Sequence, residues 1–462
     1  MAGESAGETA MSSVAGSELL GSLFGTAEVS ALFTERARLQ GMLDFEAGLA
    51  RAEARTGVIP ASAGPAIAGK CRAELFDIAD LGHATARAGN PVIPMVARLA
   101  ALVAAEDAGA ARYVHWGATS QDAMDTGLVL QLRSFLAVLE GDLRRLSAAL
   151  ARLAGAHRET LLVGRTWLQP ALPVTLGLKA AGWLDAVDRH RARLAEGGAR
   201  ALALQFGGAA GTLAALGERG LEVAEALAGE LQLPLPALPW HAHRDRMAEV
   251  ATGLGLLVGT LGKIARDVSL LMQAEVAEAF EPGGAGRGGS STMPHKRNPV
   301  AAAAVLAAAM RAPGLVATML SAMVQEHERG LGGWHAEWET LPALCVLGAG
   351  ALRQAVETIE GLELDPARMR ANLEAPHGQI LAEAVTMALG SRIGRLAAHE
   401  LVERACHQAA ATRRHLGAVL AEDPAVTAHL SRADLDRLLE YRNYLGVATA
   451  LVDRVLGSRR PD

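Results

Sequence analysis

Leucine recurs at every third or fourth position along a long stretch of the chain, between residues 128 and 153. This spacing puts the leucines on one face of a helix, because an α-helix completes a turn every 3.6 residues. A second apolar seam runs from Leu254 to Leu271, within a segment of roughly residues 245–280. The pattern predicts two long helices, the first of which begins near the acidic residues Asp122 and Asp125.

Further helical stretches are predicted at residues 174–197, 299–328 and 340–362. At ~1.5 Å per residue, helices of this kind span about 40–50 Å, which is more than one small domain needs. Alanine occupies many flanking positions, as in PVAAAAVLAAAM, so such helices are apolar on several sides and must be buried all round. One chain has too few of them to bury each other, and we therefore expect a helical bundle completed by other subunits.

Shorter helices flank this long-helix region on both sides. From Phe24 to about Ala110, glycine and proline interrupt the pattern, and after LELDPARMRANL the helices shorten again. No strand alternation persists and no internal repeat is evident. The sequence therefore predicts an all-α fold with an N-terminal helical domain, a central bundle domain that carries a loop at 283–299, and a C-terminal helical domain. The predicted boundaries are 1–22 for a flexible arm, then 23–112, 113–364 and 365–462 for the three domains.

Composition narrows the classes of partner. Half of the residues are hydrophobic, 3% are aromatic and the formal net charge is -6. Because the chain has no basic tract and no series of stacking aromatic residues, we expect neither a nucleic-acid nor a membrane-surface partner.

The cysteines and the N-terminus indicate in which cellular compartment the protein is expected. Three widely separated cysteines give neither a metal-binding spacing nor a disulfide framework, which suits a reducing cytosol. The N-terminus lacks the basic start and apolar run of a signal peptide, and no uninterrupted apolar stretch reaches the length of a membrane span. We expect a cytoplasmic protein with no metal and no cofactor.

Residues 283–299, GGAGRGGSSTMPHKRNP, form the segment richest in candidate chemistry. A glycine-rich stretch precedes two serines, a proline turn and a polar tetrad, and Pro299 opens the next helix. Backbone N–H groups at that helix start, together with Lys296, favour an anion. The same field lowers the pKa of a serine, which an isolated hydroxyl needs before it can move protons near neutral pH. The alternatives are a solvated glycine loop or a phosphate loop, but the GxxxxGK[ST] pattern is not matched.

The stretch GSSTMPHKRNP resembles the signature of the fumarase/aspartase superfamily, which includes adenylosuccinate and argininosuccinate lyases. Three more segments resemble other regions of that superfamily in order and spacing: HWGATSQDAMDT (115–126), GRTWLQPALPVTLG (164–177) and QFGGAAGT (205–212). The similarity runs from about Phe24 to the C-terminus. Two further segments, PWHAHRDR (239–246) and QEHERGLGGWHAEW (325–338), resemble the cycloisomerase branch of the superfamily.

The resemblance implies a mostly helical, three-domain subunit in a homotetramer, with each active site built from three subunits. It also implies an isomerase, namely an intramolecular lyase that interconverts 3-carboxy-cis,cis-muconate and its lactone in the protocatechuate branch of aromatic degradation. Such a substrate carries three carboxylates, so the partners we expect are a small-molecule tricarboxylate and further copies of the chain.

The resemblance assigns roles residue by residue. Ser290 matches the catalytic serine of the signature, and Lys296 and Asn298 match its substrate-carboxylate and loop-fixing positions. Substrate contacts are implied for a larger set: Thr119, Ser120, Gln121, Thr166, Gln205 and Ser291. A trianion bound by a negatively charged protein needs local cations, and on electrostatic grounds we add four more candidates. These are His243, Arg244, His295 and Arg297.

Trp167 is where the chain departs from the superfamily. The second region of the family reads GRTH, and its histidine donates a proton to the leaving group. Here Trp167 takes that position, and an indole cannot transfer a proton at neutral pH. A carboxylate leaving group is stable as an anion and needs no such donor, so the substitution favours lactone chemistry over amine release. We expect Trp167 to form a wall for the planar diene.

Other interpretations remain open at this stage. A C–N lyase of the adenylosuccinate type would need another histidine as donor, and a catalytically silent oligomer would keep only the fold. Individual residues also have structural interpretations. Ser120 and Asp122 could act as helix caps, and Arg165 could anchor a loop. Packing or structural roles are the alternative for a further set: His115, His241, Trp116, Trp334 and Trp338.

Overall fold

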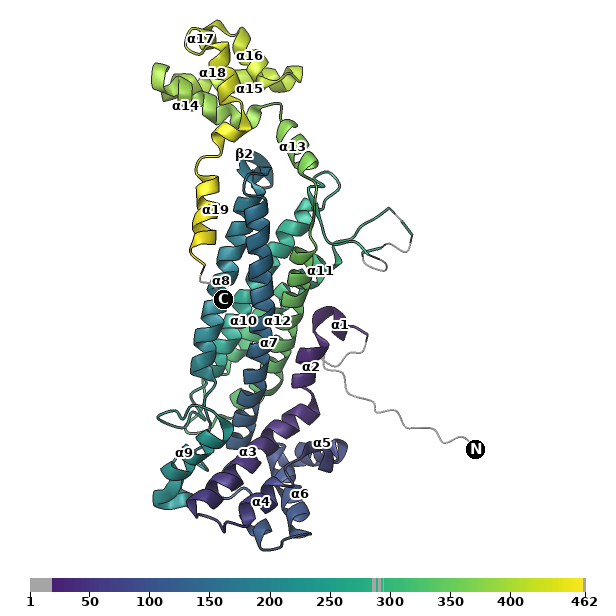
Figure 1. Ribbon diagram of the computed structural model, residues 1–462, viewed down its shortest axis with the longest axis vertical. Coiled ribbons are helices and arrows are strands. Elements are labelled where there is room, and N and C mark those ends of the chain that lie inside the picture. The colour runs from purple at the N-terminus through teal and green to yellow at the C-terminus, as the bar shows by residue number, and fades with distance from the viewer. Residues whose placement is uncertain (1–18, 285–287, 290–291, 294, 460–462) are drawn as a thin grey trace, which may run out of the picture. The chain divides into compact units, whose positions relative to one another are not determined.

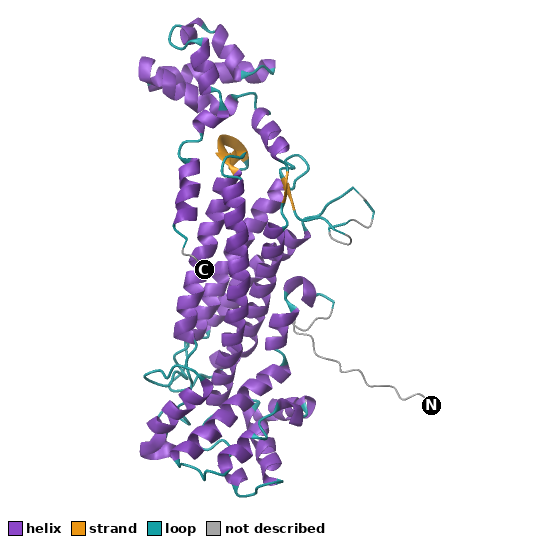
Figure 2. Ribbon diagram, viewed as in Figure 1, coloured by secondary structure: helices purple, strands orange, loops and turns teal. Residues whose placement is uncertain are grey.

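The computed structural model describes residues 19–284, 288–289, 292–293 and 295–459. Within these residues the chain is predominantly helical, with two small two-stranded sheets (Figure 2). The prediction of an all-α fold is confirmed. The predicted arm at 1–22 lies almost entirely outside the described residues.

Five long helices dominate the described chain, and Figure 1 shows α7, α10 and α12 running alongside one another. Their bounds are Ser120–Ala156 for α7, Leu176–Ala201 for α8, Asp245–Leu271 for α10, Val300–Ser321 for α11 and Gly333–Glu360 for α12. The apolar periodicity predicted all five. Helix α10 ends nine residues earlier than the expected 280. After Leu271 the chain passes through a turn, takes a positive φ of 50° at Ala277 and then enters a short strand.

The remaining helices flank this region, and most of them are short. Contrary to the expectation of short helices before Ala110, α3 has 22 residues and is as long as α11. The N-terminal set comprises α1 (Gly21–Phe24), α2 (Ala27–Leu32), α3 (Glu35–Thr56), α4 (Ala63–Ala68), α5 (Ile78–Ala88) and α6 (Val92–Ala104), and α9 (Gly220–Leu231) follows later. The C-terminal set comprises α13 (Pro366–Glu374), α14 (Ala382–Ile393), α15 (Arg395–Thr412), α16 (Leu416–Glu422), α17 (Pro424–Thr427), α18 (Arg432–Leu438) and α19 (Ala448–Gly457). Local capping sets these ends: Thr34 accepts the Ala37 N–H at the start of α3, and Gly57 ends that helix in the left-handed conformation.

The chain packs as two compact units, each assembled from three stretches. Unit 1 takes the described parts of Met1–Leu143, His190–Gly262 and Ala304–Gln354, and unit 2 takes those of Arg144–Arg189, Lys263–Ala303 and Ala355–Asp462. The division into three domains stays a prediction.

The leucine seam of α7 is the core that the sequence predicted. Leu132, Leu139 and Leu143 in unit 1 are each at most 1% exposed, as are Leu146 and Leu150 in unit 2. In unit 1, α7 also contacts α3 at a glycine pair, where a Cβ on Gly41 would lie 2.9 Å from the carbonyl oxygen of Gly127. Only glycine permits this approach, which brings the backbones of the two helices together.

Helices α10 and α11 differ in how much of their apolar surface the chain covers. By length and composition alone, these two of the described helices are apolar enough to cross a membrane. The most apolar window of α10 is 61% buried within the protein, as expected of a core helix, whereas that of α11 is only 33% buried. On α11, Met310 is 77% exposed and Leu320 is 46% exposed.

A β-hairpin forms where the sequence showed no persistent strand alternation. Strand β1 (Leu161–Thr166) pairs antiparallel with β2 (Gln169–Thr175), and β3 (Ala279–Phe280) pairs with β4 (Glu363–Leu364). The sequence pattern missed β2 because Pro170 and Pro173 interrupt it, and proline lacks the N–H that a strand ladder uses. The hairpin closes through a two-residue turn at Trp167 and Leu168, with positive φ angles of 52° and 63°.

Glu53 on α3 is fully buried, and within the described chain neither carboxylate oxygen has a hydrogen-bond partner. Burial, helped by the nearby charge of Glu46, raises its pKa from 4.5 to about 9. The folded state therefore holds the protonated form, whereas the unfolded chain ionises near pH 4.5. The stability that this proton supplies is complete below pH 4.5 and is lost as the pH rises towards about 9.

We expect Glu53→Gln to flatten this pH dependence, because glutamine stays neutral at every pH. The free energy of unfolding, measured in urea at pH 6, 7 and 8, should fall less steeply in the variant, by up to about 1.4 kcal/mol per pH unit. The matched control is Glu222→Gln, which changes an exposed carboxylate that pairs with Arg219. Parallel pH profiles for wild type and Glu53→Gln would show that Glu53 is ionised in the folded state.

Candidate active site

The sequence-predicted site residues fall in both units of the chain. Unit 1 holds Thr119, Ser120, Gln121, Gln205, His243 and Arg244, and unit 2 holds Thr166, Trp167, His295, Lys296, Arg297 and Asn298. Ser290 and Ser291 lie outside the described residues. The geometry is therefore built separately within each unit.

Asp122 is the buried centre of the unit 1 region. Its carboxylate accepts hydrogen bonds from the N–H groups of Thr119 (3.1 Å), Gly207 (3.1 Å) and Gly208 (2.9 Å). The fourth contact is His241, whose Nε2 lies 2.6 Å from Oδ1. Asp122 thus ties the start of α7 to the 205–208 loop and to the segment before α10. This agrees with the structural interpretations of Asp122 and His241.

Gln121 and Gln205 complete this scaffold, and both are at most 1% exposed. The Gln121 amide donates to the His241 carbonyl (2.9 Å) and accepts from Arg329 Nε (3.0 Å). The Gln205 amide oxygen accepts from the Trp240 N–H (2.9 Å). Because both amides bind the protein's own segments, we revise the expected substrate contacts of these two glutamines to a scaffold role. Thr119 and Ser120 remain partly exposed beside them.

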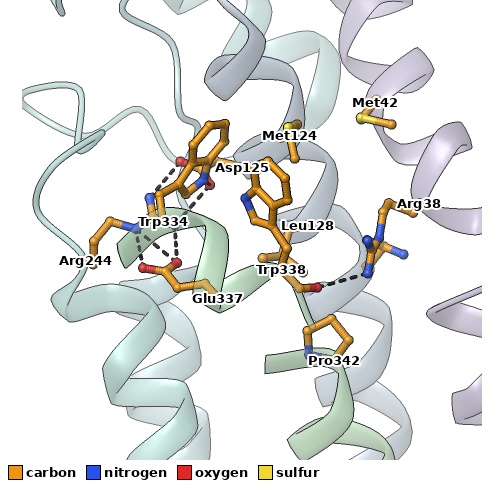
Figure 3. Close-up of a pocket in the computed structure, with 11 residues that line it drawn as sticks. Arg38, Met42, Met124, Asp125, Leu128, Arg244, Trp334, Glu337, Trp338 and Pro342 are labelled. Atoms are coloured by element: carbon orange, nitrogen blue, oxygen red, sulfur yellow. Dashed lines mark hydrogen bonds and ion pairs between the residues drawn. The ribbon is translucent and has the colours of Figure 1, made fainter. Parts of the chain in front are cut away.

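Arg244 lies in a buried ion cluster with Asp125 and Glu337, which Figure 3 shows in close-up. Its guanidinium donates to the Asp125 carboxylate at 2.7 and 3.0 Å. It donates to the Glu337 carboxylate at 2.5 to 3.1 Å. Burial raises the pKa of Glu337 and Arg244 opposes that rise. With its donors committed and its side chain 1% exposed, Arg244 is revised from a substrate contact to a structural cation. His243, by contrast, is exposed.

A pocket adjoins this Arg244 ion cluster, and two tryptophans and two methionines make much of its wall (Figure 3). Its lining residues are Arg38, Met42, Met124, Asp125, Leu128, Gln131, Arg244, Trp334, Glu337, Trp338 and Pro342. Trp334 is 5% exposed and donates its indole N–H to Asp125 (3.1 Å), which agrees with the packing role expected of it. Arg244 is the one predicted site residue in this lining, so the pocket is not the predicted substrate site.

His115 pairs with a buried carboxylate close to the start of α7. Its Nδ1 lies 2.6 Å from Glu46 Oε1, and Glu46 is 1% exposed. Burial alone would lower the pKa of His115, but the charge and hydrogen bond of Glu46, with the charge of Asp122, raise it overall. The backbone of His115 has a positive φ of 59°. The pair thus places an imidazole whose pKa a buried carboxylate raises four residues before Thr119.

In unit 2, the β1–β2 hairpin is anchored by Arg165. Its guanidinium makes two bonds of 2.8 Å to the Glu278 carboxylate, and Glu278 also accepts from the Asn372 amide (2.9 Å). Arg165 is therefore a loop anchor, as one interpretation of the sequence expected. Beyond it, Thr166 is exposed and Trp167 is 97% exposed at the hairpin tip.

The turn at Trp167 and Leu168 is strained. Turns with positive φ at both central residues strongly prefer Asn-Gly, because side chains cost roughly 1–2 kcal/mol each in the left-handed conformation. Here the two positions carry a large indole and a leucine, and Leu168 is 72% exposed. Strain and apolar exposure at one tip are typical of a functional position.

The signature segment is anchored by its own backbone. Asn298 donates its N–H to Gly288 (2.8 Å) and its side-chain amide to Gly289 (3.3 Å), which are the contacts of a loop-fixing residue. Arg297 donates to the Glu363 carboxylate (3.0 Å) and the Glu281 carbonyl (2.9 Å), and its side chain remains 45% exposed, so its expected substrate contact stays a prediction. His295 and Lys296 are exposed and make no ion pair among the described residues.

The start of α11 binds a carboxylate of the protein itself. The sequence predicted that backbone N–H groups there, together with Lys296, favour an anion. The buried carboxylate of Glu281 accepts from the N–H groups of Ala301 (3.0 Å) and Ala302 (2.7 Å). Glu281 therefore occupies these N–H groups, and the expected role of Lys296 stays a prediction.

Comparison with known proteins shows which superfamily the chain belongs to. A family model described as "Lyase" matches residues 25–314, and one described as "Adenylosuccinate lyase C-terminus" matches residues 378–455. The 3-carboxy-cis,cis-muconate cycloisomerase of Pseudomonas aeruginosa is 62% identical over 446 residues, covering 96% of this chain and 97% of that relative. The chain belongs to the fumarase/aspartase superfamily.

Two further members of the superfamily are similar over nearly their whole length. The cycloisomerase of the same name from Bradyrhizobium diazoefficiens is 57% identical over 450 residues, covering 97% of this chain and 100% of that relative. The crystal structure of 3-carboxy-cis,cis-muconate lactonizing enzyme from Pseudomonas putida aligns with a TM-score of 0.90 at 55% identity. That alignment covers 96% of this chain and 98% of that one.

Sequence reasoning named the superfamily segments but missed several carboxylates that organise them. Glu278, Glu281 and Glu337 are each at most 3% exposed, and their partners are mostly far away in the sequence. A signal was present, since acidic residues recur within the otherwise apolar stretch QAEVAEAFEP. Charges in such a stretch are typical of paired, buried groups.

Proposed function

We propose that this protein is a 3-carboxy-cis,cis-muconate cycloisomerase. It is an isomerase that interconverts 3-carboxy-cis,cis-muconate and its lactone in the protocatechuate branch of aromatic degradation. The observation that carries the proposal is 62% identity to the Pseudomonas aeruginosa cycloisomerase across 96% of this chain. Trp167, in place of the superfamily's proton-donating histidine, supports the same reaction.

The chemistry explains why that histidine is dispensable. One carboxylate of the substrate adds to the β-carbon of its own conjugated acid and closes a five-membered lactone. Charge moves onto the neighbouring carboxylate as an enediolate, and the α-carbon then takes up a proton. In reverse, the leaving group is a carboxylate, which is stable as an anion. One acid–base group therefore suffices, and the protein's main electrostatic task is to stabilise the enediolate.

We assign the proton transfer at the α-carbon to Ser290, which lies outside the described residues, and the enediolate charge to Lys296. Exposure of Lys296 without an ion pair among the described residues supports this role. Asn298 holds the loop through Gly288 and Gly289. Thr119, Ser120, Thr166, Ser291, His243, His295 and Arg297 are the remaining candidates for the substrate's carboxylates.

The proposed assembly is a homotetramer with active sites shared between subunits. The apolar surface of α11, one-third buried within one chain, supports burial against other copies. Sedimentation equilibrium should give four times the 48.0 kDa subunit mass. A monomer at micromolar concentration would contradict the assembly.

The proposed location is the cytoplasm. Cys71, Cys345 and Cys406 are all free thiols, as suits a reducing compartment. Fractionation of the producing cells should recover the enzyme with cytoplasmic markers, and recovery in a secreted fraction would contradict this.

Substitution of Trp167 tests the proposal that the hairpin tip forms a wall of the substrate site. We expect Trp167→Gly to raise KM about tenfold, because the ring that positions the diene is lost. The thermal unfolding midpoint should stay unchanged or rise, since glycine relieves the positive-φ strain at this turn. Trp167→Phe is the matched control, and it should keep most of the activity. An unchanged KM in Trp167→Gly would remove Trp167 from the substrate site.

The His115–Glu46 pair supports one alternative function. An imidazole whose pKa a buried carboxylate raises, near the first substrate region, is the kind of group that a C–N lyase would need in place of the missing donor. The decisive experiment runs two assays side by side: loss of the 3-carboxymuconate absorbance, and release of fumarate from adenylosuccinate. Activity in the first assay alone supports the proposed function, and activity in the second alone overturns it.

A further inference from the structure

Two buried carboxylates, Glu278 and Glu281, stand three residues apart on either side of strand β3. We propose that they are positioning residues and that the segment 278–281, called here the brace, fixes the hairpin and the signature segment of one subunit relative to each other. The proposal rests on the proposed function, because it assigns what each carboxylate does for that reaction.

Glu278 is the hairpin side of the brace. Its side chain is fully buried and receives both 2.8 Å bonds from Arg165 and a 2.9 Å bond from Asn372. The Glu278 carbonyl also accepts from the Asp365 N–H (3.0 Å). Bidentate Arg–carboxylate pairs fix orientation as well as distance, so this contact sets the direction in which the hairpin leaves the protein. Thr166 and Trp167 follow Arg165 directly.

Glu281 is the signature side of the brace. Its two oxygens take the N–H groups of Ala301 and Ala302, the second and third residues of α11. A carboxylate at a helix N-terminus is held both by the hydrogen bonds and by the helix dipole. Because Asn298 and Lys296 immediately precede α11, fixing the helix start fixes the base from which both side chains extend.

Strand β3, between the two carboxylates, connects the contacts of Glu278 to those of Glu281. Phe280 pairs with Glu363 across the small β3–β4 sheet, and the Arg297 guanidinium lies over the Phe280 ring at 5.0 Å. The Glu363 carboxylate takes both the Gly283 N–H (2.8 Å) and Arg297 (3.0 Å). It thereby links the two ends of the 283–299 segment to the brace.

This arrangement gives the two carboxylates different kinetic signatures. Glu278 acts through the hairpin that carries Thr166 and Trp167, which bind substrate in the proposed site, so its loss raises KM. Glu281 acts through Lys296 and the Asn298-held loop, which stabilise the enediolate, so its loss lowers kcat. A general loss of folded protein would lower kcat in both variants and leave KM unchanged.

The test measures kcat and KM for 3-carboxy-cis,cis-muconate in Glu278→Gln and Glu281→Gln. We expect KM to rise about tenfold to a hundredfold in the first and kcat to fall by a similar factor in the second, since misplacement by about 1 Å costs this much. The matched control is Glu422→Gln, which removes a carboxylate that also receives two bonds from one arginine, Arg414, but at the surface. Its constants should stay within about twofold of wild type.

Amide hydrogen exchange adds a readout that does not depend on turnover. Glu281→Gln should speed exchange at Ala301 and Ala302 by at least about tenfold, while Glu278→Gln leaves these amides unchanged. If Glu278→Gln does not fold, Asn372→Ala removes one donor to the same carboxylate and should raise KM by a smaller factor.

The possible outcomes distinguish a failure of the brace proposal from a failure of the proposed function. If wild type and Glu422→Gln both lack cycloisomerase activity, the proposed function fails, and the brace as assigned to this reaction fails with it. If both are active and the two brace variants keep wild-type constants, or both lose kcat alone, the brace is overturned while the function stands. Opposite signatures in KM and kcat, with faster exchange at the start of α11, support it.

Discussion

Replacing Ser290 with alanine is expected to lower kcat for lactone formation by about 10²- to 10⁴-fold, the usual contribution of a positioned acid–base group. The reason is that the mechanism assigns only one proton transfer to the protein, and no other assigned residue can perform it. The measurement is the loss of diene absorbance under saturating substrate, with the sedimentation profile recorded in parallel.

Ser391→Ala is the control for this substitution, because Ser391 is exposed on α14 and bonds only the Ala388 carbonyl among the described residues. It should behave as wild type. Full activity in Ser290→Ala, in protein that sediments as wild type does, would remove Ser290 from the proton transfer and leave that step without an assigned residue.

Arg244→Met is expected to cost about 3–5 kcal/mol in the free energy of unfolding. The substitution leaves Asp125 and Glu337 buried without their cation, and both are at most 2% exposed. Leaving a buried charge without its partner destabilises the folded state by more than the intact ion cluster stabilises it. Urea unfolding at pH 7 measures the loss.

The matched control is Arg414→Met, which breaks a bidentate pair with Glu422 at the surface. There the expected loss is below about 1 kcal/mol, because water solvates the carboxylate that remains. Equal losses at the two sites would show that the Arg244 cluster is reached by water in solution.

The long helices were predictable because their apolar periodicity is local. Leu132, Leu139 and Leu146 recur at steps of seven residues, and burial at each of them follows from one face packing inward. The hairpin was not predictable in this way, since Pro170 and Pro173 lie in the strand and the two-residue turn lacks the usual Asn-Gly. Its pairing depends on tertiary context.

The candidate site was predictable as a set of segments but not as a set of contacts. The order of GRTW, QFGG and SSTMPHKRN along the chain selected the loops that form the candidate site. Which cations are free depends on carboxylates far away in sequence. Arg244 pairs with Glu337 in the interior, whereas Arg297 pairs with Glu363 at the surface and stays 45% exposed, so burial separates two cations that the sequence had treated alike.

The same point explains the helix start at α11. A sequence can show that a helix begins after Pro299 and that its N–H groups favour an anion. It cannot show that Glu281, some twenty residues earlier, occupies them. The carboxylate at this helix start is the protein's own.

The measurement that tests the central claim most directly is an ultraviolet assay of the purified protein with 3-carboxy-cis,cis-muconate. The account predicts loss of the conjugated-diene absorbance with formation of the lactone, and no fumarate from adenylosuccinate under the same conditions. Persistent diene absorbance with active release of fumarate would contradict it.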